Sequence, residues 1–186
     1  MRTTLRTVRV IICALFASGI ASSQSKVRKS APEPTAFYED CGDGRSCVFD
    51  NPLPLPDSVL DALRETKEAR SMQDELKGLN GEQFSHLFRA VKAHLVGPKE
   101  TDYVVMGGFP MGGADAPWFW IVRFDQDHPR VIFFTFANGF ELLSMRNNGY
   151  PNIRSRAFAG GTEYTNVYHY DGEQYLLVRR YQREAR

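Results

Sequence analysis

The sequence predicts an α+β protein: two or three helices in the first half, packed on an antiparallel meander sheet of about six or seven strands in the second. Two observations carry this prediction. Apolar residues recur at helical spacing up to residue 97, whereas β-branched and aromatic runs separated by short turn signals follow residue 100. Because joints this short require antiparallel neighbours, we expect a meander with the helices on one of its faces.

The composition is that of a small globular protein. The chain has 186 residues, of which 42% are hydrophobic, 12% aromatic and 24% charged. Its length suits one domain with a hydrophobic core. Its aromatic content excludes a chain that is disordered over its whole length. The formal net charge of +1 gives no bulk attraction to nucleic acid or to an anionic membrane. We therefore expect no nucleic-acid partner.

Residues 1–23 have the order of a secretory signal peptide. Three arginines precede an apolar stretch from Val10 to about Ala21, and small residues follow it. The apolar stretch is about 12 residues long, shorter than the roughly 20 of a membrane-spanning helix, although an uncleaved anchor is the alternative. We expect cleavage after Ala21 or Ser23, and an exported protein, periplasmic or secreted, without a membrane span. Since the three arginines leave with the signal, the mature chain would be slightly acidic.

The segment 24–50 is expected to be a polar tether, with disorder over residues 24–36. Cys41 and Cys47 form an even pair in a chain expected to be exported, and the polar residues between them can close a small ring. We predict a Cys41–Cys47 disulfide that fixes a turn. Two thiols without a nearby histidine fall short of a zinc site, and we expect no metal and no cofactor.

A single α+β domain is expected over residues 51–186, beginning with helices between residues 57 and 97. The prolines of 51–56 favour an extended lead-in, and Asp57 or Ser58 caps the first helix. This could be one long helix or two short ones, ending at Gly78. A second helix begins at the Asn80 cap and ends at Gly97-Pro98. Its apolar residues follow a helical period and are Phe84, Leu87, Phe88, Val91 and Leu95. On that helix His86 and His94 would share a face.

The sheet is expected between residues 101 and 182. Its predicted strands are Tyr103–Met106, Trp118–Phe124, Val131–Ala137, Phe140–Arg146, Ile153–Phe158, Tyr164–Tyr170 and Tyr175–Tyr181. Asn138-Gly139 joins two of these runs directly and is a strong hairpin signal. Asn148-Gly149 and Asp171-Gly172 mark two more turns, and Asp125–Pro129 marks a longer one.

The chemistry-bearing residues favour no particular reaction. Asp125, Asp127 and His128 share a turn that could hold a divalent cation, but the turn lacks the glycine and the distal glutamate of a calcium loop. No serine lies in a G-x-S-x-G motif. We therefore predict no catalytic residue, and this turn is the alternative site for a hydrolase or a metal-dependent enzyme.

The glycine-rich run 107–113 is the most unusual local feature. It lacks the Lys-Ser/Thr end of a phosphate-binding loop. One interpretation is a flexible crossover loop, and the other is a recognition loop that exposes Phe109 and Met111.

Both tryptophans of the chain follow that run. Strand alternation places Trp118 and Trp120 on one face and Phe119 on the other. The two tryptophans pack the sheet against the helices, or they form an aromatic platform for a carbohydrate or a peptide.

Three segments carry a resemblance to a known group of proteins. They are residues 112–123, 148–153 (NGYPNI) and 167–175 (VYHYDGEQY). The chain resembles a group of small exported bacterial proteins with an NGYxDI…YxFDGxxY pattern and no assigned biochemical function, with Asn152 where the pattern has Asp. The pattern is also reminiscent of FG-GAP-type β modules, whose calcium-binding acidic loop this chain lacks. The resemblance implies turn and strand chemistry and transfers no catalytic residue.

These observations favour an exported domain that binds a protein or an envelope ligand without catalysis. The candidate binding residues are Phe109, Met111, Trp118 and Trp120. The alternatives are an enzyme that uses the acidic turn, and an immunity or inhibitor protein.

Overall fold

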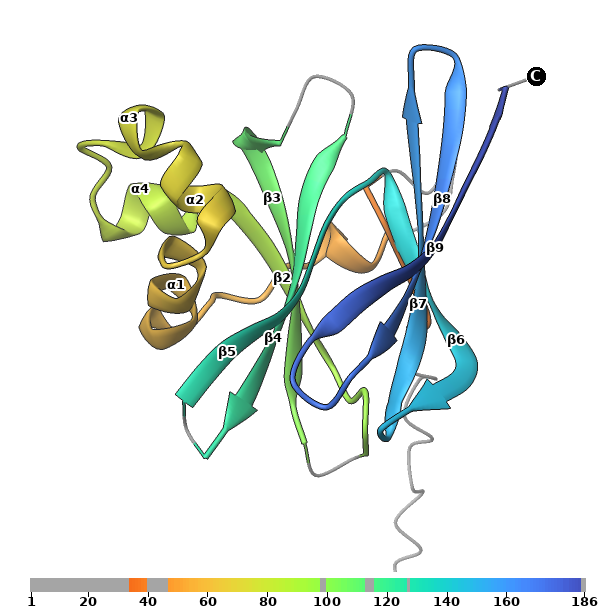
Figure 1. The fold of residues 1–186 in the computed structure, drawn as a ribbon. Coiled ribbons are helices and arrows are strands. Elements are labelled where there is room, and N and C mark those ends of the chain that lie inside the picture. The colour runs from red at the N-terminus through yellow and green to blue at the C-terminus, as the bar shows by residue number, and fades with distance from the viewer. Residues whose placement is uncertain (1–33, 40–46, 98–99, 113–115, 127, 185–186) are drawn as a thin grey trace, which may run out of the picture. The chain divides into compact units, whose positions relative to one another are not determined.

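Two antiparallel sheets, of five and four strands, form most of the protein (Figure 1). The computed structural model describes residues 34–39, 47–97, 100–112, 116–126 and 128–184, all within one unit, Pro32–Arg186. The predicted combination of helices and antiparallel strands is confirmed in this coarse form. The strands, however, divide between two sheets instead of forming one meander, and the fold is mainly β.

The five-stranded sheet has the order β1-β6-β7-β8-β9 and the four-stranded sheet the order β2-β3-β4-β5. The strands of the first are β1 Ala36–Tyr38, β6 Gly139–Asn147, β7 Tyr150–Ala159, β8 Thr162–Tyr170 and β9 Tyr175–Glu184. Those of the second are β2 Phe88–Ala93, β3 Asp102–Gly112, β4 Pro117–Asp125 and β5 His128–Phe136. The helices are η1 Val48–Asp50, α1 Asp57–Arg64, α2 Lys67–Ser71, α3 Gln73–Leu76 and α4 Gly81–Ser85.

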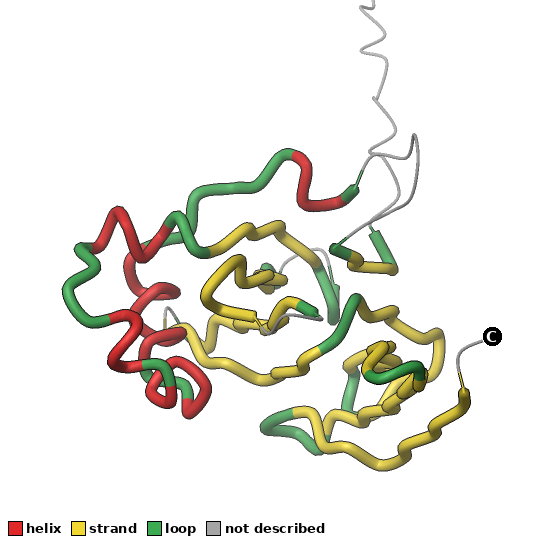
Figure 2. Tube along the Cα trace, turned by 90° about the horizontal axis from the view of Figure 1, so that it is seen from above, coloured by secondary structure: helices red, strands yellow, loops and turns green. Residues whose placement is uncertain are grey.

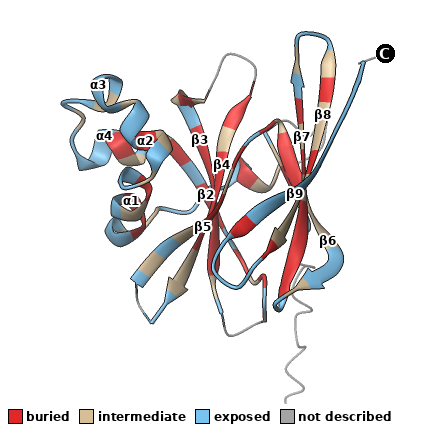
Figure 3. Ribbon diagram, viewed as in Figure 1, coloured by how far each residue is buried: buried red, intermediate tan, exposed pale blue. Residues whose placement is uncertain are grey.

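Three layers result, because the four-stranded sheet is buried on both faces. One apolar cluster fills the space between the sheets and includes Phe119, Ile121 and Phe140. The other packs the helices, through residues such as Leu63 and Phe84, against the opposite face of the four-stranded sheet. Figure 2 shows the helices beside one sheet and the second sheet beyond it, and Figure 3 shows the buried residues along the sheet interiors.

The predicted helix over residues 80–97 is wrong beyond Ser85. Residues 88–93 form β2, which pairs antiparallel with β3. Phe88 and Ala90 face the helices, whereas Val91 and Ala93 face the other sheet. A strand buried on both faces has apolar residues at nearly every position, so a helical period also fits it. His86 and His94 consequently do not share a helix.

The predicted tether over residues 24–50 is wrong at residues 36–38, which form β1, and at residues 48–50, which form η1. β1 pairs with β6, and both Phe37 and Phe49 belong to the core between the sheets. The Phe37 ring stacks on Phe140 with 4.9 Å between centroids, and the Phe49 ring lies tilted against Phe119 with 6.0 Å between centroids. Cys41 and residues 1–23 lie outside the described residues, so the disulfide with Cys47 and the signal peptide stay predictions.

Three predicted turns lie between paired strands. Asn148-Gly149 joins β6 to β7, Asp171-Gly172 lies between β8 and β9, and the segment Asp125–Pro129 contains the turn between β4 and β5. A fourth hairpin, at Gly160-Gly161 between β7 and β8, was not predicted.

The hairpin predicted at Asn138-Gly139 is wrong. Among the described strands β5 pairs with β4 alone, and β6 pairs with β1 and β7, so this step crosses from one sheet to the other. A Cβ atom on Gly139 would overlap the ring of Tyr38 and lie 2.7 Å from the carbonyl oxygen of Phe37. Glycine is needed here for the close approach of β1, and the crossing divides the predicted meander in two.

Candidate functional site

Residues 107–112 of the glycine-rich run are part of β3 and not a crossover loop, and Gly113 lies outside the described residues. Gly107 of β3 lies opposite Trp118 of β4, and Gly112 lies opposite Pro117. Pro117 and Trp118 are adjacent in β4, whereas residues 108–111 separate the two glycines in β3. Those intervening residues form a large bulge. The Gly108 N–H donates to the carbonyl oxygen of Leu87 over 2.6 Å and ties the bulge to the start of β2.

The bulge turns one apolar side chain inward and one outward. Met111 folds back over Gly107, where a Cβ atom would lie 2.8 Å from the Met111 Cβ. Met111 is fully buried, and the expectation that it is exposed is wrong. Phe109 is 93% exposed. Burial of Met111 therefore anchors a bulge that presents Phe109 to solvent.

The two tryptophans share a face of β4, as the alternation predicts, and Phe119 points to the other cluster. Trp120 is fully buried and lies edge-on to Phe88 at 5.8 Å between ring centroids, so it packs the sheet against the helical layer. Trp118 is only half-buried. Of the pair, only Trp118 can contribute to a surface.

Two phenylalanines of β5 continue the aromatic surface. Phe134 lies edge-on to Trp118 at 5.7 Å between centroids, and Phe136 is opposite Trp118 in the register and partly exposed. We call Phe109, Trp118, Phe134 and Phe136 the aromatic row: Trp118 is linked to the two β5 residues by ring contact and register, and Phe109 lies on the β3 bulge next to Gly107, the register partner of Trp118. The sequence analysis did not select Phe134 and Phe136, although their spacing in the run Val131–Phe136 places them on one face.

A groove adjoins the β5 end of the aromatic row. It has a volume of about 410 Å³. Its lining residues are Phe134, Thr135, Phe136, Ala157, Ala159, Tyr164, Asn166, Tyr168 and Arg180. Within the described part of the chain β5 is the last strand of its sheet, so no described strand pairs with its outer edge. The Arg180 Nε–H donates to Asn166 Oδ1 over 2.8 Å, and the Thr135 and Tyr168 hydroxyls are 3.1 Å apart, which places polar groups in the groove.

Residues of the segments 148–153 and 167–175, together with Arg123, form a hydrogen-bonded cluster, whereas Trp118 of the segment 112–123 belongs to the aromatic row. Tyr170 Oη accepts from Arg123 over 2.7 Å and donates to the Gly172 carbonyl over 2.9 Å. Asn148 Nδ2 donates to the Tyr170 carbonyl over 3.0 Å, and the Tyr175 hydroxyl donates to the Pro151 carbonyl over 2.8 Å. These bonds hold the β6–β7 and β8–β9 hairpins against each other, so the motif residues act in the fold.

Asp102 is buried close to this cluster. Burial raises the pKa of its carboxyl group from 3.8 to about 6, against the effect of the Leu95 N–H, which donates to Asp102 Oδ2 over 3.3 Å. Burial, and after it the charge of Asp102, raise the pKa of the Tyr150 hydroxyl well above its usual range. Asp102 is 1% exposed, which leaves it out of reach of a substrate.

The acidic turn has no built site around it. Asp125 and His128 lie opposite each other where β4 and β5 meet, both exposed, and Asp127 lies outside the described residues. No group of three or more His, Cys, Asp or Glu side chains in the described part of the chain could hold a metal ion. Within the same residues, no helix has the length and apolarity needed to cross a membrane.

No protein-family model, no curated protein and no solved structure matches this chain.

Proposed function

We propose that this chain is an exported binding domain that takes a protein partner on the aromatic row and performs no chemistry. The observation that carries the proposal is Phe109, 93% exposed at the tip of a bulge whose base is fixed by buried Met111. An aromatic side chain held in water by a structured element has lost the burial that usually stabilises it. Exposed aromatic residues that cluster are typical anchors of protein interfaces.

A protein partner fits the row better than a carbohydrate. Trp118 and Phe134 meet at an interplanar angle of 87°, so the two rings do not share a flat face on which a sugar could stack. An apolar side chain of a protein can contact ring edges as well as ring faces. Among the described residues no strand follows β5 in its sheet, an arrangement that suits strand addition by an extended segment.

Two sequence features support export and the absence of catalysis in this proposal. The charge and hydrophobic order of residues 1–23 favours export. The resemblance to exported bacterial proteins rests on turn and strand residues and transfers no catalytic residue. An immunity or inhibitor protein is the special case in which the partner is a toxin or a lytic enzyme.

Photo-crosslinking of the full chain in its native host tests the proposal. A photoreactive phenylalanine analogue at position 109 should give one adduct of defined mass, while the same analogue at Phe158, an exposed residue on β7, should give none. Phe109→Ala should lower partner recovery about tenfold and Phe158→Ala less than twofold. Equal adducts at both positions, or none at 109, would overturn the proposal. So would hydrolase turnover that His128→Ala abolishes.

A further inference from the structure

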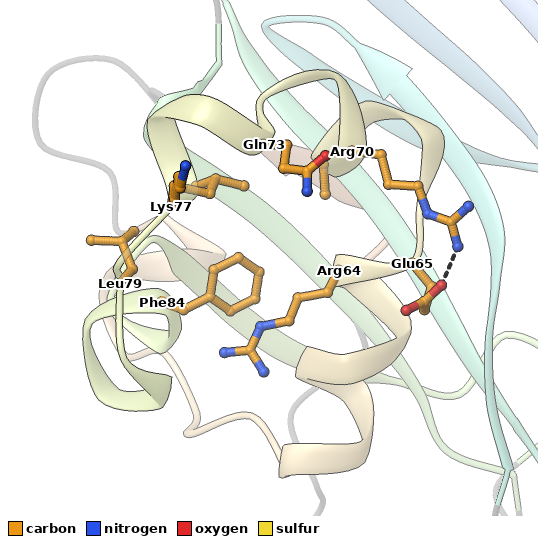
Figure 4. Close-up of a pocket in the computed structure, with 9 residues that line it drawn as sticks. Arg64, Glu65, Arg70, Gln73, Lys77, Leu79 and Phe84 are labelled. Atoms are coloured by element: carbon orange, nitrogen blue, oxygen red, sulfur yellow. Dashed lines mark hydrogen bonds and ion pairs between the residues drawn. The ribbon is translucent and has the colours of Figure 1, made fainter.

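A cavity on the helical layer, remote in sequence from the aromatic row, combines an apolar floor with a cationic rim (Figure 4). Its volume is about 530 Å³, within the usual range of roughly 300–1,000 Å³ for small-molecule sites. The lining residues come from α1 to α4 and the turns between them. They are Arg64, Glu65, Ala69, Arg70, Gln73, Leu76, Lys77, Leu79 and Phe84.

The floor is apolar and rigidly supported. Phe84 and Ala69 are buried, and Leu76 and Leu79 are half-buried against the cluster that joins the helices to the four-stranded sheet. The Phe84 ring also lies edge-on to Phe88 of β2, with 5.0 Å between centroids. An apolar chain placed here would cover side chains that are already held in position.

The rim carries three cations and one acid. The Arg64 guanidinium stacks on the Phe84 ring at 4.3 Å from its centroid and binds Asp61 over 3.1 Å. Arg70 pairs with Glu65. Lys77 has no ion-pair partner among the described residues, and Figure 4 shows it with Gln73 across the cavity from Phe84 and Arg64. Two of the three cations are thus paired with acids, and Lys77 is the rim cation that no ion pair neutralises within the described residues.

We propose that this cavity binds a small amphipathic carboxylate: an anionic head at Lys77 and Gln73, and an apolar chain on the floor formed by Phe84 and Leu79. The head would gain charge-assisted hydrogen bonds, and the chain would be removed from water. A cationic amphiphile would meet like charge at the rim. A small anion without a chain would leave the floor uncovered. The proposal does not depend on the aromatic row.

Calorimetric titration with decanoate, below its micellar concentration, tests the ligand class. Decanoate should bind, decanol should bind about tenfold more weakly, and decylammonium and acetate should give no detectable heat of binding. Decylammonium that binds as tightly as decanoate would overturn the proposal. Association with phosphatidylglycerol vesicles in the absence of decanoate binding would also overturn it, because it would indicate a membrane-facing charge patch.

Two charge reversals on exposed positions test the site. Lys77→Glu should weaken decanoate binding about tenfold or more. Lys67→Glu, on the same helical layer but outside the cavity, should leave binding within twofold and serves as the matched control. Equal losses in both variants would show that decanoate senses only overall charge and would overturn the assignment. Arg64→Lys keeps the charge but loses the planar stacking on Phe84, and should have an intermediate effect.

Discussion

The chain contains two Asn-Gly steps in its strand region, and they adopt different backbone conformations. Asn148 and Gly149 have φ angles of 47° and 84° and close the two-residue hairpin between β6 and β7. Asn138 and Gly139 have no positive φ, and they carry the chain from the four-stranded sheet to the five-stranded one. The same dipeptide therefore forms a turn in one place and an extended crossing in the other.

The difference lies in what surrounds each asparagine. The Asn138 N–H donates to the Arg156 carbonyl over 2.8 Å, its side-chain Oδ1 accepts from the Phe158 N–H over 3.0 Å, and its carbonyl accepts from Glu39. A turn preference is worth about 1 kcal/mol, and three hydrogen bonds of about 1 kcal/mol each exceed it. At Asn148 the side chain instead donates to Tyr170, which lies on the neighbouring hairpin and stabilises the turn.

Gly139→Ala should have the largest effect on this comparison. The added Cβ would overlap Tyr38 and lie 2.7 Å from a backbone oxygen, so β1 must move away from β6. We expect a loss of about 3 kcal/mol in the free energy of unfolding, measured by urea denaturation. Gly81→Ala is the control, because a Cβ there meets nothing within 4 Å. Equal stability of the two variants would contradict the close-approach explanation.

The strands after residue 100 and most of their turns could be predicted because each signal is local. Alternation at Trp118, Phe119 and Trp120 gives the two faces of β4 correctly. The crossing at Asn138-Gly139 could not be predicted, since the residues that hold it are distant in the sequence: Tyr38 and Glu39 from β1 and the segment after it, and Arg156 and Phe158 from β7. The same holds for β2, whose apolar residues fit a helix until both neighbouring layers are known.

The candidate site was predictable only in part, for a similar reason. Phe109 is exposed as expected, but the inward turn of Met111 depends on Gly107 and the register with β4. The cavity of the helical layer is built by residues of separate short helices. Its cations, Arg64, Arg70 and Lys77, have no regular spacing in the sequence.

Changes of pH should affect the two regions in opposite directions. Asp102 is linked to the Asn148 region through the backbone of Leu95. The Leu95 N–H donates to the Asp102 carboxylate, and the Arg146 guanidinium donates to the Leu95 carbonyl oxygen over 2.7 Å. Because the Asp102 pKa is raised from 3.8 to about 6, the native state binds more protons than the unfolded state in that range. Burial of the ionised form therefore costs stability above pH 6, and the cost disappears as the pH falls below 4.

Asp102→Asn should thus stabilise the protein at pH 7 by about 2–3 kcal/mol, with no gain at pH 4. Denaturation of both proteins at several pH values measures the difference.

Near the Asn138 crossing the pH dependence of stability has the opposite sign. The hydrogen bond from Tyr38, and then Arg154, hold the pKa of Glu141 below its usual 4.5, so its contribution is lost as the pH falls through that range. Glu141→Gln should cost stability at pH 7 and less at pH 3. An effect of Asp102→Asn that does not change with pH would contradict the raised pKa of the Asp102 carboxyl group.

Gly149→Ala should have a smaller effect than Gly139→Ala, although Gly149 is the glycine in the turn. Its φ of 84° is unfavourable for alanine, but a Cβ there would have no neighbour closer than 3.9 Å. We expect a loss of about 1–2 kcal/mol from backbone strain alone. Gly149→Asn should recover part of it, because asparagine tolerates positive φ. A loss as large as that of Gly139→Ala would mean that conformation, and not the approach of β1, governs both steps.

Asn138→Ala should have the smallest effect and the most local one. It removes the acceptor of the Phe158 N–H but leaves the backbone bonds to Arg156 and Glu39, so we expect a loss of about 1 kcal/mol. Hydrogen exchange should show faster exchange at the Phe158 amide and unchanged protection at Tyr150, on the hairpin closed by the other Asn-Gly step. Asn148→Ala should give the reverse pattern, since that side chain bonds Tyr170. If both substitutions speeded exchange at the same amides, the two Asn-Gly steps would belong to one cooperative unit. That result would contradict the distinction between a local turn at Asn148 and a crossing held by tertiary contacts at Asn138.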